Sequence, residues 1–245
     1  MGTSTKNMFE CIKEASRFKN PIIAEIKVKS PTKGDLLRKR DPIDILLEYE
    51  RAGVVGISYI TEKNIFGGNI EILRKICKYS NLPVLRKDFI TDKKEIELTA
   101  NLGASAILLI TGILKEKIGE FIDYSLDNGL EPLVEIHNID DVHYLRDTNL
   151  KMIGINNRDI LKMETDDGDV SVSENIVDYL KKDFIFKNKD YLIVSESGIK
   201  NVEDLKRALK IADSVLIGTS FMESENTEQF VKSFVFYGRN KAFIS

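Results

Sequence analysis

The chain has 245 residues, a length that suits one large α/β domain with a substantial buried core. Charged residues make up 31% of the sequence, yet the formal net charge is only -3, so no strong field of either sign attracts an anionic polymer. The composition therefore argues against nucleic acid and membrane surfaces as partners.

The cysteines and the N-terminal segment bear on the cellular compartment. Cys11 and Cys77 do not have the spacing of a metal site, and two cysteines in a chain of this length fit a reducing compartment better than a disulfide framework. The first 20 residues contain no continuous apolar stretch, and no run of about 18 apolar residues occurs in the chain. We therefore expect a cytoplasmic protein without a secretion signal or a membrane span.

A helical lead is expected around residues 7–18, and eight short apolar runs follow it. Read as strands, they are IIAEIK at 22–27, VGISYIT at 55–61, PVLRKDF at 83–89, AILLI at 106–110, PLVEI at 132–136, MIGINN at 152–157, YLIVSES at 191–197 and SVLIGTS at 214–220. Helical patterns alternate with them at about 42–53, 69–79, 92–102, 114–128, 139–147, 173–182, 201–210 and 227–237. Pro42 and Gly53 mark the two ends of the first of these helices.

Eight alternating strand and helix units predict a closed parallel (β/α)8 barrel, or TIM barrel, because short links impose right-handed crossovers and eight strands close the sheet. No linker divides the chain, so residues 1–245 are read as one domain, with the helical lead at 1–20 and the barrel at 21–245. The loosest stretch lies between Arg158 and Tyr191 and includes the acidic loop METDDGDVS. A doubly wound open sheet is the alternative, but its first turn is usually glycine-rich, whereas KVKSPTKGD has one glycine.

Charged residues end several predicted strands, although burying an unpaired charge costs roughly several kcal/mol. Glu25 and Lys27 are two apart and share a side of the first strand, Lys87 ends the third, and Glu135 ends the fifth. Alternate strands fill the same layer of a barrel, so these side chains are expected together at the C-terminal rim, where barrel enzymes carry catalytic groups. A lysine there can donate a proton, and the carboxylates can accept protons or balance a developing cation. An internal ion pair that plugs the barrel, or a Schiff base on either lysine, stays open.

The last two strands end in the small residues of SESGIK and IGTSF. Such residues let backbone N–H groups approach an anion closely, and the loops after strands 7 and 8 of a barrel often form a phosphate site with a short helix N-terminus. The candidate phosphate ligands are Ser197, Gly198, Gly218 and Thr219. Alternatively, these glycines only shape turns.

The sixth strand ends in GINNRD, in which Asn156 and Arg158 share a face. An amide and a planar guanidinium suit a carboxylate or a phosphate, although Arg158 alone could equally be a solvated rim residue. His137 and His143 have no metal-binding pattern, so no metal site is expected and both are read as ordinary polar residues.

Two further loops could border the same site. Lys29 and Lys33 follow the first strand and could close over an acidic ligand. Phe66, Gly67 and Gly68 follow the second strand and could form a hydrophobic lip on a flexible turn, or a plain loop.

Seven strand-end motifs, in order from about Ile22 to Met222, resemble those of the indole-3-glycerol phosphate synthase family. They are AEIKVKSPTKGD, YITEKNIFGG, LRKDFI, PLVEIHN, GINNRD, SESGI and IGTSFM. The resemblance implies a carbon-carbon lyase of tryptophan biosynthesis that converts 1-(2-carboxyphenylamino)-1-deoxyribulose 5-phosphate into indole-3-glycerol phosphate, carbon dioxide and water. It also implies acid-base catalysis without a metal or organic cofactor and a sugar-phosphate substrate. It leaves open contact with other tryptophan-pathway enzymes.

The resemblance also implies roles for individual residues. Lys87 would be a general acid at the substrate carbonyl, Glu135 would support positive charge on the anilino group, and Lys27 with Glu25 would serve later proton transfers. The implied catalytic set is Glu25, Lys27, Lys87, Glu135, Asn156 and Ser197. The implied substrate-binding set is Lys29, Ser30, Arg158, Glu196, Gly198, Gly218 and Thr219. The sequence leaves open which lysine acts in which step.

The chain departs from the family pattern mainly at its start. Only about 20 residues precede Pro21, whereas the family usually has roughly twice as many, including a helix that helps to cover the site. We therefore expect a shortened N-terminal extension. The competing readings are another phosphate-sugar barrel, such as phosphoribosylanthranilate isomerase, and a non-catalytic barrel that binds a sugar phosphate.

Overall fold

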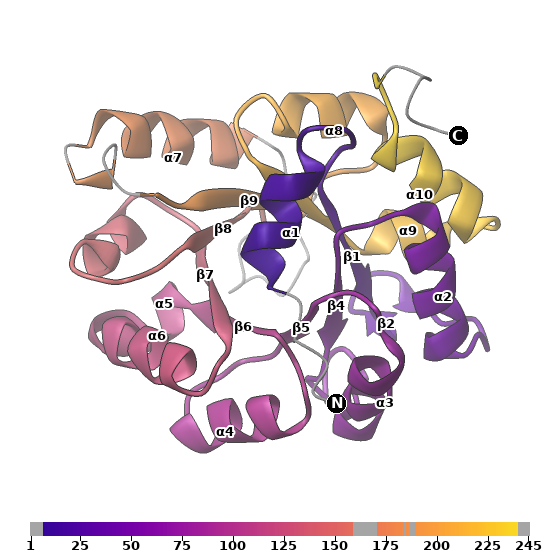
Figure 1. Cartoon of the computed structure of the whole chain (residues 1–245), viewed down its shortest axis with the longest axis horizontal. Coiled ribbons are helices and arrows are strands. Elements are labelled where there is room, and N and C mark those ends of the chain that lie inside the picture. Colours follow the sequence, from indigo (N-terminus) through magenta and orange to yellow (C-terminus); the bar gives the residue numbers. More distant parts are fainter. Residues whose placement is uncertain (1–6, 159–170, 184, 187–189, 240–245) are drawn as a thin grey trace.

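The computed structural model describes residues 7–158, 171–183, 185–186 and 190–239, and these residues build a closed barrel of eight parallel strands (Figure 1). The barrel strands are β1 (Ile22–Ile26), β4 (Gly56–Ile60), β5 (Val84–Lys87), β6 (Ala106–Ile110), β7 (Glu131–Ile136), β8 (Met152–Asn156), β9 (Leu192–Glu196) and β10 (Ser214–Ile217). Each strand pairs with the next along the chain, and β1 closes the ring between β4 and β10. The predicted (β/α)8 barrel is confirmed.

Helices surround the barrel as the alternating pattern predicts (Figure 1). They are α1 (Met8–Ala15), α2 (Pro42–Ala52), α3 (Ile70–Tyr79), α4 (Lys93–Asn101), α5 (Thr111–Leu114), α6 (Ile118–Asp127), α7 (Ser171–Lys182), α8 (Val202–Ala208), α9 (Thr219–Glu223) and α10 (Thr227–Val235). Local chemistry sets their ends: Asp41 caps α2 next to Pro42, and Gly53 ends it in a left-handed conformation at φ 87°. Within the described ranges, no helix combines the length and the apolar character needed to cross a membrane.

Two expected helices differ in the structure. The segment 114–128 is split into α5, the 3-10 helix η1 (Lys115–Lys117) and α6, because Lys115 adopts φ 49° and interrupts the α-helical path. The segment 139–147 forms only the 3-10 helix η2 (Asp140–Leu145). There, Asn138 and Asp141 side chains accept backbone N–H groups of Asp141 and His137, which competes with a regular helix.

Two small elements lie in loops at the C-terminal ends of the strands. A two-stranded hairpin of β2 (Lys29–Ser30) and β3 (Gly34–Asp35) follows β1, and the five-residue α9 follows β10. Most of the acidic METDDGDVS loop lies outside the described residues, and its last residue, Ser171, begins α7.

Strand alternation divides the core into two parts. Outward-facing residues such as Ala24 and Ile26 pack against the helices, whereas Ile23 belongs to the barrel interior. The remaining described interior core consists of Val55, Leu85, Ala106, Leu108, Ile110, Leu133, Met152, Leu192, Val194 and Leu216, together with α1 residues. The interior is therefore packed with side chains up to the level of the charged residues that follow.

Helix α1 covers the N-terminal end of this interior, and Figure 1 shows it in front of the barrel axis. Met8, Phe9 and Ile12 pack on the interior core, and Met8 occupies the space that a side chain at Gly56 would fill. The carboxylate of Glu131, at the start of β7, accepts the Met8 backbone N–H. The N-terminal lead therefore plugs the base of the barrel, at the end opposite the charged strand tips.

Candidate active site

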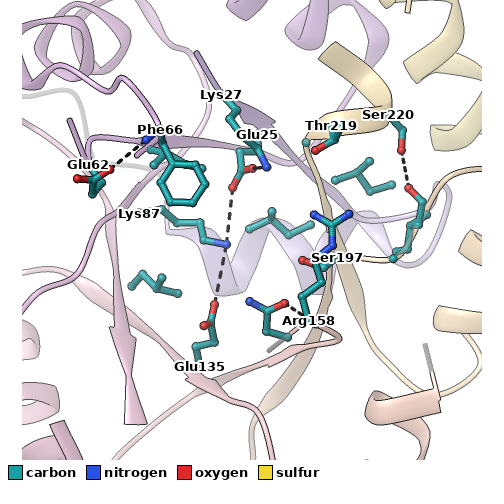
Figure 2. A pocket seen from close by; sticks show the side chains of 18 of the residues that line it. Glu25, Lys27, Glu62, Phe66, Lys87, Glu135, Arg158, Ser197, Thr219 and Ser220 are labelled. Carbon is teal, nitrogen blue, oxygen red and sulfur yellow. Dashed lines mark hydrogen bonds and ion pairs between the residues drawn. The ribbon is translucent and has the colours of Figure 1, made fainter. Parts of the chain in front are cut away.

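A cavity of about 370 Å³ opens at the C-terminal ends of the strands (Figure 2). This volume lies within the range of small-molecule sites, roughly 300–1,000 Å³. Ten of the thirteen residues predicted for the site line the cavity: Glu25, Lys27, Lys87, Glu135, Asn156, Arg158, Ser197, Gly198, Gly218 and Thr219. The structure thus brings residues from β1, β5, β7, β8, β9 and β10 to one place.

Lys87 lies at the centre of a group of three carboxylates. Its Nζ is 2.8 Å from Glu196 Oε2, 3.6 Å from Glu25 Oε2 and 3.9 Å from Glu135 Oε2. Figure 2 shows Lys87 between Glu25 and Glu135. The four residues come from β1, β5, β7 and β9, which are alternate strands of the barrel, so their side chains meet in one layer.

Two glycines make room for these carboxylates. A Cβ at Gly154 in β8 would lie 2.2 Å from Glu196 Oε1, and one at Gly218 after β10 would lie 2.4 Å from Glu25 Oε1. Atoms that are not bonded cannot approach so closely, so a larger residue at either position would displace the carboxylate. The absence of these two side chains is therefore part of how the site is built.

Burial and mutual charge shift the pKa values of this group. Burial raises the pKa of Glu196 to about 7, and the nearby Glu135 charge adds to the rise, against the opposing pull of Lys87. Burial alone would lower the pKa of Lys87, but the carboxylates of Glu196, Glu25 and Glu135 more than offset it and raise that pKa. Lys87 therefore carries its proton at neutral pH, while Glu196 can be protonated or ionised there.

Glu135 has a second cationic neighbour in His137. The Nε2 atom of His137 is 3.2 Å from Glu135 Oε1, and the Glu135 side chain is 1% exposed. Burial tends to raise the pKa of Glu135, but the His137 contact and Lys87 outweigh it and lower that pKa. The reading of His137 as an ordinary polar residue was wrong, because this imidazole touches a carboxylate at the centre of the site.

Lys27 is held beside Glu25, as the two-residue spacing predicts. The Lys27 Nζ lies 3.5 Å from Glu25 Oε1 and 5.9 Å from the centre of the Phe66 ring. Both charged residues are almost fully buried, so water screens their mutual attraction only weakly. Together with Lys87 they provide two ammonium groups that share one carboxylate.

Apolar side chains form the wall of the cavity at the ends of β4, β5 and β6. They are Ile60, Phe66, Phe89, Leu108 and Ile110. The loop that carries Phe66 is fixed by Glu62, whose carboxylate accepts the backbone N–H groups of Asn64, Ile65 and Phe66. This wall suits a flat hydrophobic group of a ligand.

Small residues form the wall at the ends of β9 and β10. Ser197 and Gly198 adopt positive φ angles of 66° and 77°, and Gly218 precedes Thr219 at the start of α9. The Asn157 amide donates to the carbonyl groups of Glu196 and Ser197 and so holds the turn after β9. This wall exposes backbone to the cavity, as a phosphate site requires.

Asn156 and Arg158 lie between the two walls. The Asn156 side-chain carbonyl accepts the Arg158 backbone N–H at 3.1 Å, and both residues line the cavity. Figure 2 shows the Arg158 side chain extending toward the part of the cavity that contains Ser197 and Thr219. A planar cation is therefore available beside the small-residue wall.

Three predicted ligands lie outside the set that lines the cavity. Glu196 is fully buried beneath Lys87. Lys29 Nζ donates to the Asn64 carbonyl at 3.0 Å, and Ser30 Oγ lies 3.2 Å from Thr32 Oγ1.

Other lining residues had no predicted role in the site. Glu62 directly follows predicted strand 2, and Asp88 and Phe89 are the last two residues of predicted strand 3, so their position at a strand end was the available signal. Lys33, considered only as a loop cation, does line the cavity, and its Nζ lies 3.2 Å from Glu223 Oε1. A position at the end of a predicted strand therefore indicates more of the cavity-lining residues than charge alone does.

Comparisons with known proteins agree with this geometry. The family model for indole-3-glycerol phosphate synthase matches residues 1–234. The indole-3-glycerol phosphate synthase of Pyrococcus furiosus is 57% identical over 217 residues, which cover 89% of this chain and 92% of the relative. That of Pyrococcus abyssi is 54% identical with the same coverage. A longer relative, the tryptophan biosynthesis protein TrpCD of Archaeoglobus fulgidus, is 48% identical over 91% of this chain and 39% of its own length. Since the family match covers nearly the whole chain and the Pyrococcus relatives align over most of theirs, this chain belongs to the indole-3-glycerol phosphate synthase family.

Proposed function

We propose that the cavity carries out the carboxy-lyase reaction of this family by acid-base catalysis, with Lys87 as the general acid of ring closure. The substrate is 1-(2-carboxyphenylamino)-1-deoxyribulose 5-phosphate, and the products are indole-3-glycerol phosphate, carbon dioxide and water. The observation that carries the proposal is the position of Lys87, which lines the cavity with its Nζ within 4 Å of three buried carboxylates. A chain that only binds a sugar phosphate has no need of such a group.

The two walls of the cavity give the substrate one orientation. The carboxyphenyl ring would lie against the apolar wall that includes Phe66 and Phe89, and the phosphate would lie against Ser197, Gly198, Gly218 and Thr219. The ribulose carbonyl then falls between the walls, where Lys87 and Glu135 line the cavity. Asn156 and Arg158 would hold the substrate carboxylate and other polar groups.

Ring closure needs a proton donor at the carbonyl oxygen. The ring carbon that bears the carboxylate attacks the ribulose carbonyl carbon, and the carbonyl oxygen takes a proton from Lys87 to become a hydroxyl group. Positive charge develops on the anilino nitrogen as the bond forms, and the ionised Glu135 would stabilise it. The lowered pKa of Glu135 keeps that carboxylate charged at neutral pH, which supports this role.

The later steps need further proton transfers. Loss of carbon dioxide restores the aromatic ring, and loss of the new hydroxyl group as water completes the indole. Lys27 and Glu25 are placed to donate and accept these protons, since they line the same cavity and lie 3.5 Å apart. Lys29 and Ser30 would bind substrate only after leaving their contacts with Asn64 and Thr32.

A steady-state assay on the purified protein tests the proposal. With 1-(2-carboxyphenylamino)-1-deoxyribulose 5-phosphate we expect indole absorbance and fluorescence to appear, at the same rate with and without a chelator. Phosphoribosylanthranilate, the substrate of the rival isomerase, should remain unchanged. Turnover of phosphoribosylanthranilate, or no indole from the first substrate, would contradict the proposal.

Association with another tryptophan-pathway enzyme is the second part of the proposal. Its support is the Archaeoglobus fulgidus relative, in which the homologous segment is part of a longer chain named for tryptophan biosynthesis. Sedimentation of this protein with and without the enzyme that supplies its substrate would test the idea. Two species that sediment independently at every concentration would argue against it.

A further inference from the structure

His137 lies two residues after Glu135 and just beyond the end of β7, so both side chains are directed to the same side of the strand. Its Nε2 is 3.2 Å from Glu135 Oε1, while the other oxygen, Oε2, is 3.9 Å from Lys87 Nζ. The two oxygens of this carboxylate therefore face different partners, the His137 imidazole and the Lys87 ammonium group. The His137 side chain is 12% exposed and is not among the residues that line the cavity.

The backbone of His137 is fixed by the turn that follows. Its N–H donates to Asp141 Oδ2 at 2.8 Å, and the Asp141 N–H donates to Asn138 Oδ1 at 3.0 Å. Asp141 is itself buried, so this arrangement is shielded from competing water. The backbone of His137 is thus held in place from η2, and the imidazole lies against Glu135.

We propose that His137 is a positioning residue that holds the Glu135 carboxylate away from Lys87 and directed toward the substrate. Without the imidazole, Glu135 could rotate onto the Lys87 ammonium, and a closer carboxylate would make the Lys87 proton harder to donate. This inference rests on the proposed role of Lys87 as a general acid.

The charges around His137 agree with an ion pair between its imidazole and the Glu135 carboxylate. Burial lowers the pKa of His137, but Glu135 first, then Asp141 and Glu196, outweigh burial and raise it above the ordinary value. These groups come from β7, η2 and β9, and Lys87 on β5 acts on the pair from beyond Glu135. His137 is therefore protonated more often at neutral pH than a solvent-exposed histidine.

Kinetics of three variants test the positioning role. We expect His137→Leu to lower kcat by about ten- to a hundredfold, the scale of one lost interaction with a charged group, with little change in KM. His137→Gln should recover most of kcat, because its amide can donate near the position of Nε2. His143→Gln, at an exposed position on η2, is the matched control and should behave as wild type. Wild-type kcat in His137→Leu would overturn the inference. It would also be overturned if His137→Gln lost as much kcat and as much melting temperature as His137→Leu.

Nuclear magnetic resonance gives a readout that does not depend on turnover. The chain has two histidines, so their imidazole titrations can be followed separately and assigned with the His137→Gln variant. Glu135→Gln should lower the pKa of His137, because coupling between two sites is reciprocal. An unchanged His137 titration in Glu135→Gln would overturn the inference. If the wild-type protein fails to make indole while this coupling is present, the proposed function fails and the His137–Glu135 pairing stands.

Discussion

The ammonium group of Lys87 lies closer to Glu196, at 2.8 Å, than to Glu25 or Glu135. Glu196 is completely buried and has a pKa of about 7, so near neutral pH this contact alternates between an ion pair and a hydrogen bond to a neutral acid. Such strongly interacting groups titrate as a unit. Protonation of Glu196 weakens the hold on the Lys87 proton, which links the charge of a buried acid to the strength of the proposed general acid.

Removal of Lys87 should abolish most turnover without abolishing the fold. We expect Lys87→Ala to lower kcat by about two to four decades, the scale of a positioned acid or base. Because the buried carboxylates of Glu196 and Glu135 lose a nearby cation, their pKa values should rise, and the variant should become less stable as the pH increases. Lys78→Ala, on the exposed face of α3, is the control. Near wild-type turnover in Lys87→Ala would refute the assigned role.

Glu135→Gln separates catalysis from structural ion pairing. The amide keeps the size of the side chain but not its charge, so we expect a normally folded protein whose kcat falls by about two decades. Circular dichroism and urea unfolding would report the fold, and the indole assay would report turnover. A variant that unfolds, or loses most of its stability, would instead favour the structural reading in which the charges only plug the barrel.

The pH dependence of stability provides a test of Glu196. Its pKa is about 7 in the folded protein, whereas the ordinary value, which applies to the unfolded chain, is 4.5. The stabilising contribution of Glu196 is therefore full below about 4.5 and is lost as the pH rises toward 7. Glu196→Gln does not titrate at this position. We therefore expect its free energy of unfolding to increase relative to that of the wild type as the pH rises through this window, as measured by urea denaturation at several pH values. A difference that does not change with pH would contradict the burial-driven pKa.

Gly154→Ala tests the space reserved for Glu196. The added Cβ would lie 2.2 Å from Glu196 Oε1, so the variant should lose about 1–3 kcal/mol of stability, the usual cost of overpacking, and also lose turnover. Gly119→Ala in α6 meets its nearest atom only at 3.6 Å and should be nearly neutral. The double variant Gly154→Ala with Glu196→Ala should regain stability relative to Gly154→Ala. If it does not, the clash lies elsewhere.

The barrel and most of its charged layer could be predicted because both depend on local patterns. Short apolar runs that alternate with helical patterns predict the strands. The two-residue period of a strand then places Glu25 on the same side as Lys27 and directs Lys87 and Glu135 inward. Which strands become alternate members of one layer follows from the strand count alone. No long-range distance was needed for these predictions.

The remaining features depend on distances between strands, which the sequence does not give. Glu196 shares the inward face of β9, but only its 2.8 Å distance to Lys87, on the non-adjacent strand β5, shows that it lies under that lysine rather than against a ligand. His137 also follows the two-residue period, but the absence of a metal-binding pattern gave no sign of its contact with Glu135. Arg86 faces outward from the same strand as Lys87 and is buried against Asp88 and Glu95. The sequence gives no sign of these contacts, because both partners are found only once the chain is folded.

Helix α1 seals one end of the barrel with Met8, Phe9 and Ile12. In the part of the chain that the structure describes, the barrel interior is then open to solvent at one end, the rim where the cavity lies. Substrate must come in, and the indole product, carbon dioxide and water must go out, by that passage. Departing molecules therefore compete with arriving substrate for the same route, and accumulated indole-3-glycerol phosphate should slow the enzyme by occupying it.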